Sequence, residues 1–367
     1  MHLMYSSPAS KMVNFINLAD FLREKEPKDF ILIMDSNVSI YLENYFDDPV
    51  GTISNWNNHN NCELLTDFFE MIKCIRERKL EFDIFNALNE NCRDILGDYS
   101  LNTDKFFLRV DKALNLIEDL PIKDVLYPYG PFKSSTNFYN YELIFKPLIT
   151  KYDNPKTSTY LILSYVFTLK IKQLMSDKNK NNFQKLRSFY NFMTNEVDFI
   201  SLVHWGTAIL CFGGLKLKSG KSITRLIHIT KKKNISKRDS YIRGIWNAAI
   251  DLAWVIEVCQ EVKRGNKIPI FVTNDEAINE IMKRYTLRMF IKGIDNMPAI
   301  AEFDLSGTNF NASFEKEINI LEKDLIKRQR IDRQYRYINV KRFLGNEFRE
   351  HLIDIKQKLE ENIPDYI

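Results

Sequence analysis

The stretch that most constrains the fold is Phe30–Ser39, in which five apolar residues run directly into Asp35. A short apolar run bounded by polar residues predicts a strand that is buried on both of its faces. The apolar positions from Val38 to Tyr45 recur every three or four residues and predict a helix. Asp35 therefore falls at the carboxyl end of a predicted central strand, which is the edge where open α/β sheets bind ligands. Because an unpaired buried carboxylate is costly, we expect Asp35 to have partners.

A second apolar run, Ile268–Val272, repeats this arrangement and continues into a Thr-Asn-Asp sequence that ends at Asp275. A further strand is predicted over Phe82–Phe85, and helical patterns separate the three runs along the chain. Strands that alternate with helices predict an α/β fold with a central parallel sheet flanked by helices. Adjacent parallel strands would place Asp35 and Asp275 at the same edge of that sheet.

Further carboxylates fall in positions that need a polar partner. Asp251 interrupts an otherwise apolar helical pattern over residues 245–262, and it shares a face with Asn247, four residues earlier. Another acid follows the second predicted strand, and the sequence leaves its identity open among three residues: Glu90, which we favour, Asp83 and Asp94.

Several carboxylates gathered at one site resist ionising together, because like charges repel. A divalent cation relieves that repulsion, and Mg²⁺ and Mn²⁺ prefer hard oxygen ligands while keeping several bound waters. The pattern therefore predicts a Mg²⁺ or Mn²⁺ site, and the chemistry it favours is metal-assisted hydrolysis of phosphodiester bonds.

Taken in order, these motifs resemble the PIN-domain nucleases over residues 28–96 and 243–292. In that family the first strand ends in Asp, followed by Ser or Thr and then Asn, and a helix-borne Asp precedes a strand that ends in Thr-x-Asp. The resemblance implies a catalytic, metal-binding set of four acids: Asp35, Glu90, Asp251 and Asp275. It implies that Ser36, Thr273 and Asn274 orient a ligand or water, and Asn37 and Asn247 accompany them in the motifs.

The resemblance also implies an activity, the metal-dependent cleavage of single-stranded RNA by a ribonuclease. The family includes the toxins of toxin–antitoxin pairs, so an antitoxin-like partner or self-association is an open expectation. DNA is the alternative substrate.

The PIN-like pattern occupies less than half of the chain and is interrupted. We expect residues 1–99 and 211–312 to form the PIN-like domain, 100–210 to form a helical insertion or lobe, and 313–367 to form a helical tail. Within the first part, the pattern predicts one short helix over Val13–Lys25 and a loop over Asp47–Asn61, which is rich in Asn, Asp, Gly and Pro.

A basic segment, Lys216–Arg243, directly precedes the Asp251 helix. The net charge of +4 permits a nucleic-acid partner without requiring one. We expect the basic side chains nearest the helix to contact RNA phosphates: Lys231, Lys232, Lys233, Lys237, Arg238 and Arg243. The alternative is that they form an ordinary solvated face.

Composition excludes several other classes. The most apolar stretch, Phe199–Leu215, is too short to span a bilayer, and the chain lacks the start of a signal peptide. The five cysteines form no C-x-x-C pair, and no zinc-binding spacing of His and Cys is present. These features predict a cytoplasmic protein with reduced thiols and no membrane partner.

Each predicted ligand also has a structural alternative. Asp35 and Asp275 could simply cap the helices that follow them, and Asp251 could form an ion pair. The sequence from Asp35 approaches the D-x-S-x-S motif of non-catalytic metal-dependent binding modules, but it has Asn37 where a hydroxyl ligand is required. Gly214–Ser222 misses the P-loop motif by one residue between its glycines. The competing function is therefore an RNA-binding or metal-dependent binding scaffold that performs no chemistry.

Overall fold

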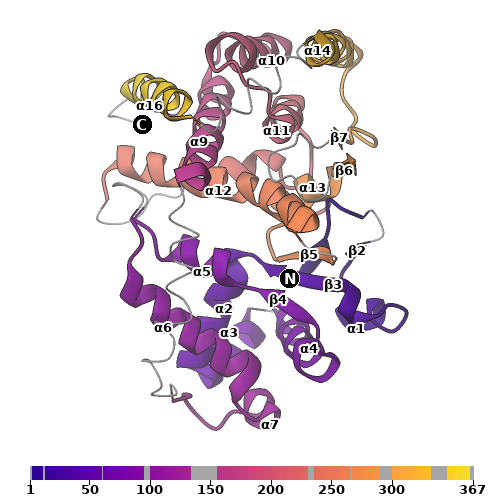
Figure 1. The fold of residues 1–367 in the computed structure, drawn as a ribbon, viewed down its shortest axis with the longest axis vertical. Helices are drawn as coiled ribbons and strands as arrows, with labels where there is room; N and C mark the ends of the chain where they lie inside the picture. The colour runs from indigo at the N-terminus through magenta and orange to yellow at the C-terminus, as the bar shows by residue number, and fades with distance from the viewer. Residues whose placement is uncertain are drawn as a thin grey trace. The chain divides into compact units, whose positions relative to one another are not determined.

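The computed structural model describes residues 2–10, 13–59, 61–94, 100–133, 155–229, 235–264, 267–289, 300–331 and 345–363. The chain divides into two compact units (Figure 1). The first contains Met1–Asp153 and Val258–Lys283, and the second contains Asn154–Glu257 and Arg284–Ile367. These boundaries fall at places other than the divisions expected after residues 99, 210 and 312. Helix α12, Lys237–Arg264, contributes residues to both units.

A five-stranded sheet in the order β2-β1-β5-β3-β4 organises the first unit. Its strands are β1 (Met4–Ser6), β2 (Asn14–Phe15), β3 (Phe30–Met34), β4 (Glu81–Asp83) and β5 (Ile268–Thr273). The central strand β3 pairs in parallel with both β5 and β4, while β1 runs antiparallel to β5. The expected parallel α/β core is therefore confirmed, and the complete sheet is mixed.

Helices surround this sheet in the first unit. They are α1 (Leu18–Phe21), α2 (Ser36–Asp47), α3 (Pro49–Asn58), α4 (Cys62–Arg78), α5 (Phe85–Asn91), α6 (Thr103–Leu114), α7 (Ile122–Leu126) and α13 (Glu276–Arg284), whose last residue is assigned to the second unit. Helix α2 buries the apolar face that its sequence predicts, through Val38, Leu42 and Tyr45. Helix α6 ends in a π-helical turn, Asn115–Asp119.

The predicted loop over Asp47–Asn61 is wrong, because most of it forms helix α3. The Asp48 carboxylate accepts a hydrogen bond from the Gly51 amide at 2.9 Å, and Pro49 occupies the first turn. An Asp cap followed by Pro is a strong helix-start signal. At this position it outweighs the Asn and Gly content that favours a loop.

The predicted helix over Val13–Lys25 is also wrong for most of its length, because Asn14–Phe15 forms β2 and only Leu18–Phe21 is helical.

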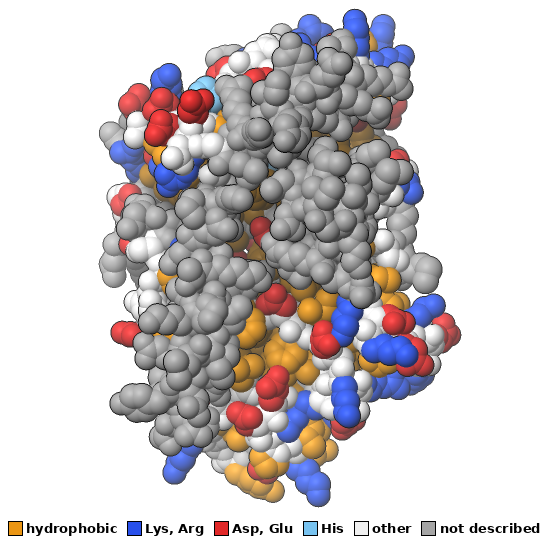
Figure 2. Space-filling view, viewed as in Figure 1, with side chains coloured by type: hydrophobic (Ala, Val, Ile, Leu, Met, Phe, Trp, Pro, Cys, Tyr) orange, Lys and Arg blue, Asp and Glu red, His pale blue; other side chains and the backbone are white. Residues whose placement is uncertain are grey.

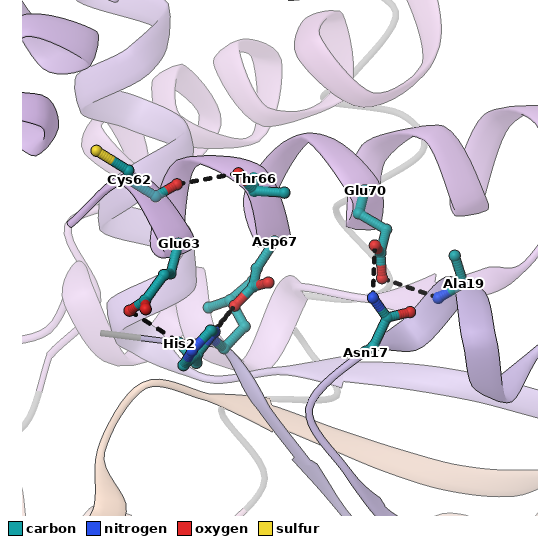
Figure 3. A network of polar contacts seen from close by, with 9 residues as sticks. His2, Asn17, Ala19, Cys62, Glu63, Thr66, Asp67 and Glu70 are labelled. Carbon is teal, nitrogen blue, oxygen red and sulfur yellow. Dashed lines mark hydrogen bonds and ion pairs between the residues drawn. The ribbon is translucent and has the colours of Figure 1, made fainter.

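Three acids of α4 bind residues near the N-terminus (Figure 3). Asp67 accepts hydrogen bonds from the Leu3 amide at 2.9 Å and contacts the His2 ring at 3.0 Å. Glu70 accepts from the Ala19 amide at 2.8 Å and the Asn17 side chain at 3.3 Å, while Glu63 lies 3.5 Å from His2. These long-range contacts fix the segment that carries β1.

The described residues of the second unit are mainly helical, and among them β6 (Tyr285–Met289) pairs with β7 (Ile300–Phe303) in a two-stranded antiparallel sheet. The helices of this unit, besides most of α12, are α9 (Pro155–Ser176), α10 (Asn182–Asn191), α11 (Leu202–Gly213), α14 (Ala312–Ile331) and α16 (Asn346–Glu361). Within the described ranges, none of the chain's helices combines the length and apolar content that a bilayer crossing requires.

A fully buried histidine lies in the core of the second unit. The Ser164 hydroxyl donates to the Ala249 carbonyl oxygen at 2.6 Å, so it can only accept the hydrogen bond from His204 Nε2 at 2.9 Å. The remaining ring nitrogen, Nδ1, then accepts from the Ser201 hydroxyl at 2.7 Å. Burial lowers the pKa of His204 to about 3, so the imidazole is neutral in the folded protein.

Candidate functional site

Asp35 lies at the carboxyl end of β3 and is 1% exposed. Its Oδ1 atom accepts hydrogen bonds from the Ser36 amide at 2.7 Å and the Ser36 hydroxyl at 3.3 Å. Its Oδ2 atom accepts from the Asn37 amide group at 3.1 Å and the Thr273 hydroxyl at 2.6 Å. The expected partners of this buried carboxylate are therefore confirmed, and they include both motif neighbours, Ser36 and Asn37.

Thr273 joins the ends of the two central strands. While its hydroxyl donates to Asp35, the same oxygen accepts the Asp275 backbone N–H at 2.9 Å. The Asp275 carboxylate accepts the Ala277 amide through Oδ1 at 2.7 Å. Among the described residues, no hydrogen bond reaches Asp275 Oδ2, and the residue is only half-buried. The edge of the sheet thus presents one fully bonded carboxylate, Asp35, and one with an open oxygen, Asp275.

The surroundings of Asp35 raise the pKa of its carboxyl group. Burial raises its pKa, hydrogen bonds from Thr273, Asn37 and Ser36 lower it, and the nearby Asp275 charge raises it. The net direction is upward despite these donors. Backbone donors and the helix dipole lower the pKa of a capping carboxylate, and at Asp35 burial outweighs them.

The helix-cap geometry expected as the alternative is present at both acids. Asp35 caps α2 through the Ser36 amide, and Asp275 caps α13 through the Ala277 amide. Capping explains why each aspartate follows a strand and precedes a helix. It does not explain why Asp35 is buried near a second carboxylate, Asp275, which follows the adjacent parallel strand.

Tyr41 completes the polar groups around this edge. The Asn274 side-chain amide donates a hydrogen bond to the Tyr41 hydroxyl oxygen. Burial and the Asp35 charge raise the pKa of Tyr41 to about 12, so the phenol is neutral at physiological pH. The sequence pattern assigned Tyr41 to the apolar face of the helix. The signal that could have found it is its spacing of four residues from Asn37, which puts both side chains on one face of α2.

Helix α5 approaches the start of α2 through Asn91. Its side-chain amide donates to the Ser36 carbonyl oxygen at 3.0 Å and contacts the Ser39 hydroxyl at 2.7 Å. Glu90, the residue before it, is half-buried. The two alternatives differ: Asp83 ends β4 and accepts the Phe85 amide at 2.9 Å, whereas Asp94 is exposed. The second acid of the set therefore stays a prediction.

Asp251 lies on α12 and belongs to the second unit, so its predicted role beside Asp35 stays a prediction. Asp251 is half-buried, while Asn247 on the preceding turn is exposed. Across the described ranges of the chain, no three His, Cys, Asp or Glu side chains are grouped as a metal ion would require.

The predicted RNA-binding residues divide into two groups. Lys231, Lys232 and Lys233 lie outside the described residues. Lys237 and Arg238 are exposed on the first turn of α12, and Arg243 is half-buried further along it. On the part of the first unit that Figure 2 shows, Lys and Arg side chains are interspersed with Asp and Glu among hydrophobic ones.

Replacing Thr273 with Val is expected to destabilise the first unit by about 1–3 kcal/mol, because a buried carboxylate loses a donor and a buried amide loses its acceptor. The pKa of Asp35 should rise further for the same reason. Thr273→Ser keeps the hydroxyl and should behave nearly like the native chain. Hydrogen exchange in peptides from β3 and β5 measures the effect, and equal protection in both variants would contradict it.

Comparison of the chain with protein-family models, with curated proteins and with solved structures finds no match in any of the three.

Proposed function

We propose that the chain is a divalent-metal-dependent endoribonuclease of PIN-like type, and that its centre lies at the carboxyl edge of β3 and β5. The observation that carries this proposal is the pair of carboxylates, Asp35 and Asp275, which follow the carboxyl ends of adjacent parallel strands. Asp35 is buried where its charged form is disfavoured, and Asp275 keeps an oxygen open to a ligand. The order of motifs along the chain, including Asp251 and Glu90, supports the same assignment.

The residues at this edge fit a hard divalent cation. The donor set consists of carboxylate oxygens whose mutual repulsion a cation would relieve. Asp275 Oδ2 would contact the ion, and Asp35 would supply the second negative charge, held in place by Thr273 and Asn37. When bound, Mg²⁺ or Mn²⁺ supplies polarisation of the phosphoryl group and a water of lowered pKa.

The protein's own contribution is orientation. The Thr273 hydroxyl fixes the spacing between the two strand ends, because it bonds the carboxylate of one and the backbone of the other. The caps of α2 and α13 fix the direction of each carboxylate. Positioning of this kind lets a site act without reorganising when the substrate arrives.

The competing function is a scaffold that binds RNA or a metal without cleaving. Two observations favour it: both aspartates have hydrogen bonds that suffice for helix capping, and the described residues contain no group of three metal ligands. The same experiment separates the two functions.

The test is cleavage of single-stranded RNA and DNA with Mg²⁺ or Mn²⁺, repeated after chelation. Asp275→Asn is expected to lower the rate by about 10²-fold or more, because it removes a charged ligand. The matched control is Asp48→Asn, which changes another helix-capping aspartate that is exposed at the start of α3. Cleavage that survives chelation, or equal loss in both variants, would refute the metal centre. RNA binding without cleavage would favour the scaffold.

The same assay on Asp251→Asn and Glu90→Gln tests the remaining two acids.

A further inference from the structure

We propose that Tyr41 is a substrate-binding residue whose phenol donates a hydrogen bond to a phosphodiester oxygen beside the carboxylate pair. This inference rests on the proposed nuclease function and deepens it. It adds a residue that neither the motifs nor the family resemblance assigns.

Two contacts hold the phenol in place. The Asn274 amide donates to the hydroxyl oxygen, and Asn274 lies between Thr273 and Asp275 in the turn from β5 to α13. The Tyr41 ring packs edge to face on Trp56, with centroids 5.5 Å apart and an interplanar angle of 85°. Trp56 is only 6% exposed, so the aromatic support is part of the core.

The hydroxyl proton is left for another acceptor. Because the phenol oxygen accepts from Asn274, its own O–H points elsewhere, and within the described part of the chain no group accepts it. Tyr41 is half-buried, so an incoming ligand can reach it. The donor is therefore oriented, neutral and accessible.

A phosphodiester needs such a donor at this place. Two carboxylates repel an anionic substrate, and each non-bridging phosphate oxygen gains most from donors that are already oriented. Asn37, one turn before Tyr41 on the same face of α2, directs an amide N–H at Asp35. The Tyr41 O–H is a donor on that face that is not directed at the carboxylate pair.

The helix also provides a matched control. Tyr45 lies four residues further along α2, and its hydroxyl donates to the Val125 carbonyl oxygen at 2.6 Å in the buried interior. Tyr41→Phe and Tyr45→Phe remove the same atom from the same helix. Tyr41→Phe keeps the aromatic ring against Trp56. Of the two variants, only Tyr41→Phe changes a group near Asp35.

The experiment measures binding and turnover separately. Fluorescence anisotropy measures the binding of a fluorescein-labelled single-stranded RNA oligonucleotide in the presence of Mn²⁺. The protein carries Asp35→Asn, so that the RNA is not cleaved during the measurement. Tyr41→Phe should raise Kd about tenfold, which is the loss of one charge-assisted hydrogen bond. In the native chain the same change should raise KM, while Tyr45→Phe should leave both constants unchanged. Hydrogen exchange over α2 should be equal in the native chain and Tyr41→Phe.

Each other outcome is decisive. If the native chain cleaves RNA and Tyr41→Phe alters neither Kd nor KM, this inference is overturned and the nuclease function stands. If Tyr45→Phe weakens binding equally, the effect belongs to the helix, and the inference is again overturned. If the native chain neither binds nor cleaves RNA with either metal, the proposed function fails and the inference fails with it.

Discussion

Replacing Asp35 with Asn is expected to lower RNA cleavage on the order of 10³-fold while leaving the first unit folded and no less stable at neutral pH. The loss of activity follows from removing the buried charge that the proposed metal centre requires. The retained stability follows from the raised pKa of Asp35. These two outcomes together distinguish a functional acid from a structural cap.

The sign of the stability effect follows from linkage. A group whose folded pKa lies above its unfolded value favours the folded state at low pH, and this contribution is lost as the pH rises through the folded pKa. The raised pKa of Asp35 therefore stabilises the fold at low pH, and this contribution is lost towards neutral pH. Asparagine keeps the shape and the cap, since Asn and Asp are equally good at helix N-termini.

Hydrogen exchange in peptides from β3 and α2, measured from pH 4 to pH 7, tests this expectation. The stability of Asp35→Asn relative to the native chain should increase as the pH rises. Asp48→Asn is the control, because that aspartate is an exposed cap. A loss of stability at pH 7 in Asp35→Asn, with RNA cleavage unchanged, would show that Asp35 is only a cap.

Acid is expected to destabilise the second unit, because its buried histidine, His204, must take up a proton. The folded pKa of His204 is about 3 against an ordinary value of 6.5, so between these pH values the unfolded chain binds more protons. Stability is then lost as the pH falls from about 6.5 towards 3, by roughly 4 kcal/mol for this single group. The imidazolium could not keep the present hydrogen bonds, because Nδ1 accepts from Ser201 only when it carries no proton.

Tryptophan fluorescence provides the readout, since Trp205, Trp246 and Trp254 are buried in the second unit and only Trp56 lies in the first. His204→Gln keeps a donor and an acceptor but cannot titrate in this range. We expect that variant to be less stable at pH 7, where it loses the contact with Phe167, and to lose less stability on acidification. Parallel acid-unfolding curves for the two proteins would contradict the assignment.

The parts of the fold that the sequence predicted are those with a strong local pattern. β3 and β5 are continuous apolar runs, and their parallel pairing follows from the helices between them, so the meeting of Asp35 with Asp275 was predictable. β1 is only three residues long and has no periodicity of its own. Its position depends on pairing with β5 and on the acids of α4, which are contacts that local sequence does not encode.

The site shows the same division. Ser36, Asn37 and Thr273 were predictable because their spacing from a strand end is short and characteristic. Tyr41 was not, because its role depends on a contact with Asn274, 233 residues away in sequence. The division of the chain into units was equally hidden, because α12 is one continuous helical pattern that serves both.

The antiparallel pairing of β1 with β5 also protects the sheet edge beside the candidate site. β1 covers the side of β5 that faces away from β3, with Met4 opposite Thr273. If residues 2–7 were removed, the strand carrying Thr273 would become a bare sheet edge with unpaired amide and carbonyl groups, which is a template for pairing with another molecule. A shortened protein should then lose both the geometry of the candidate site and its resistance to aggregation, although the deleted residues lie far from Asp35 and Asp275 in sequence.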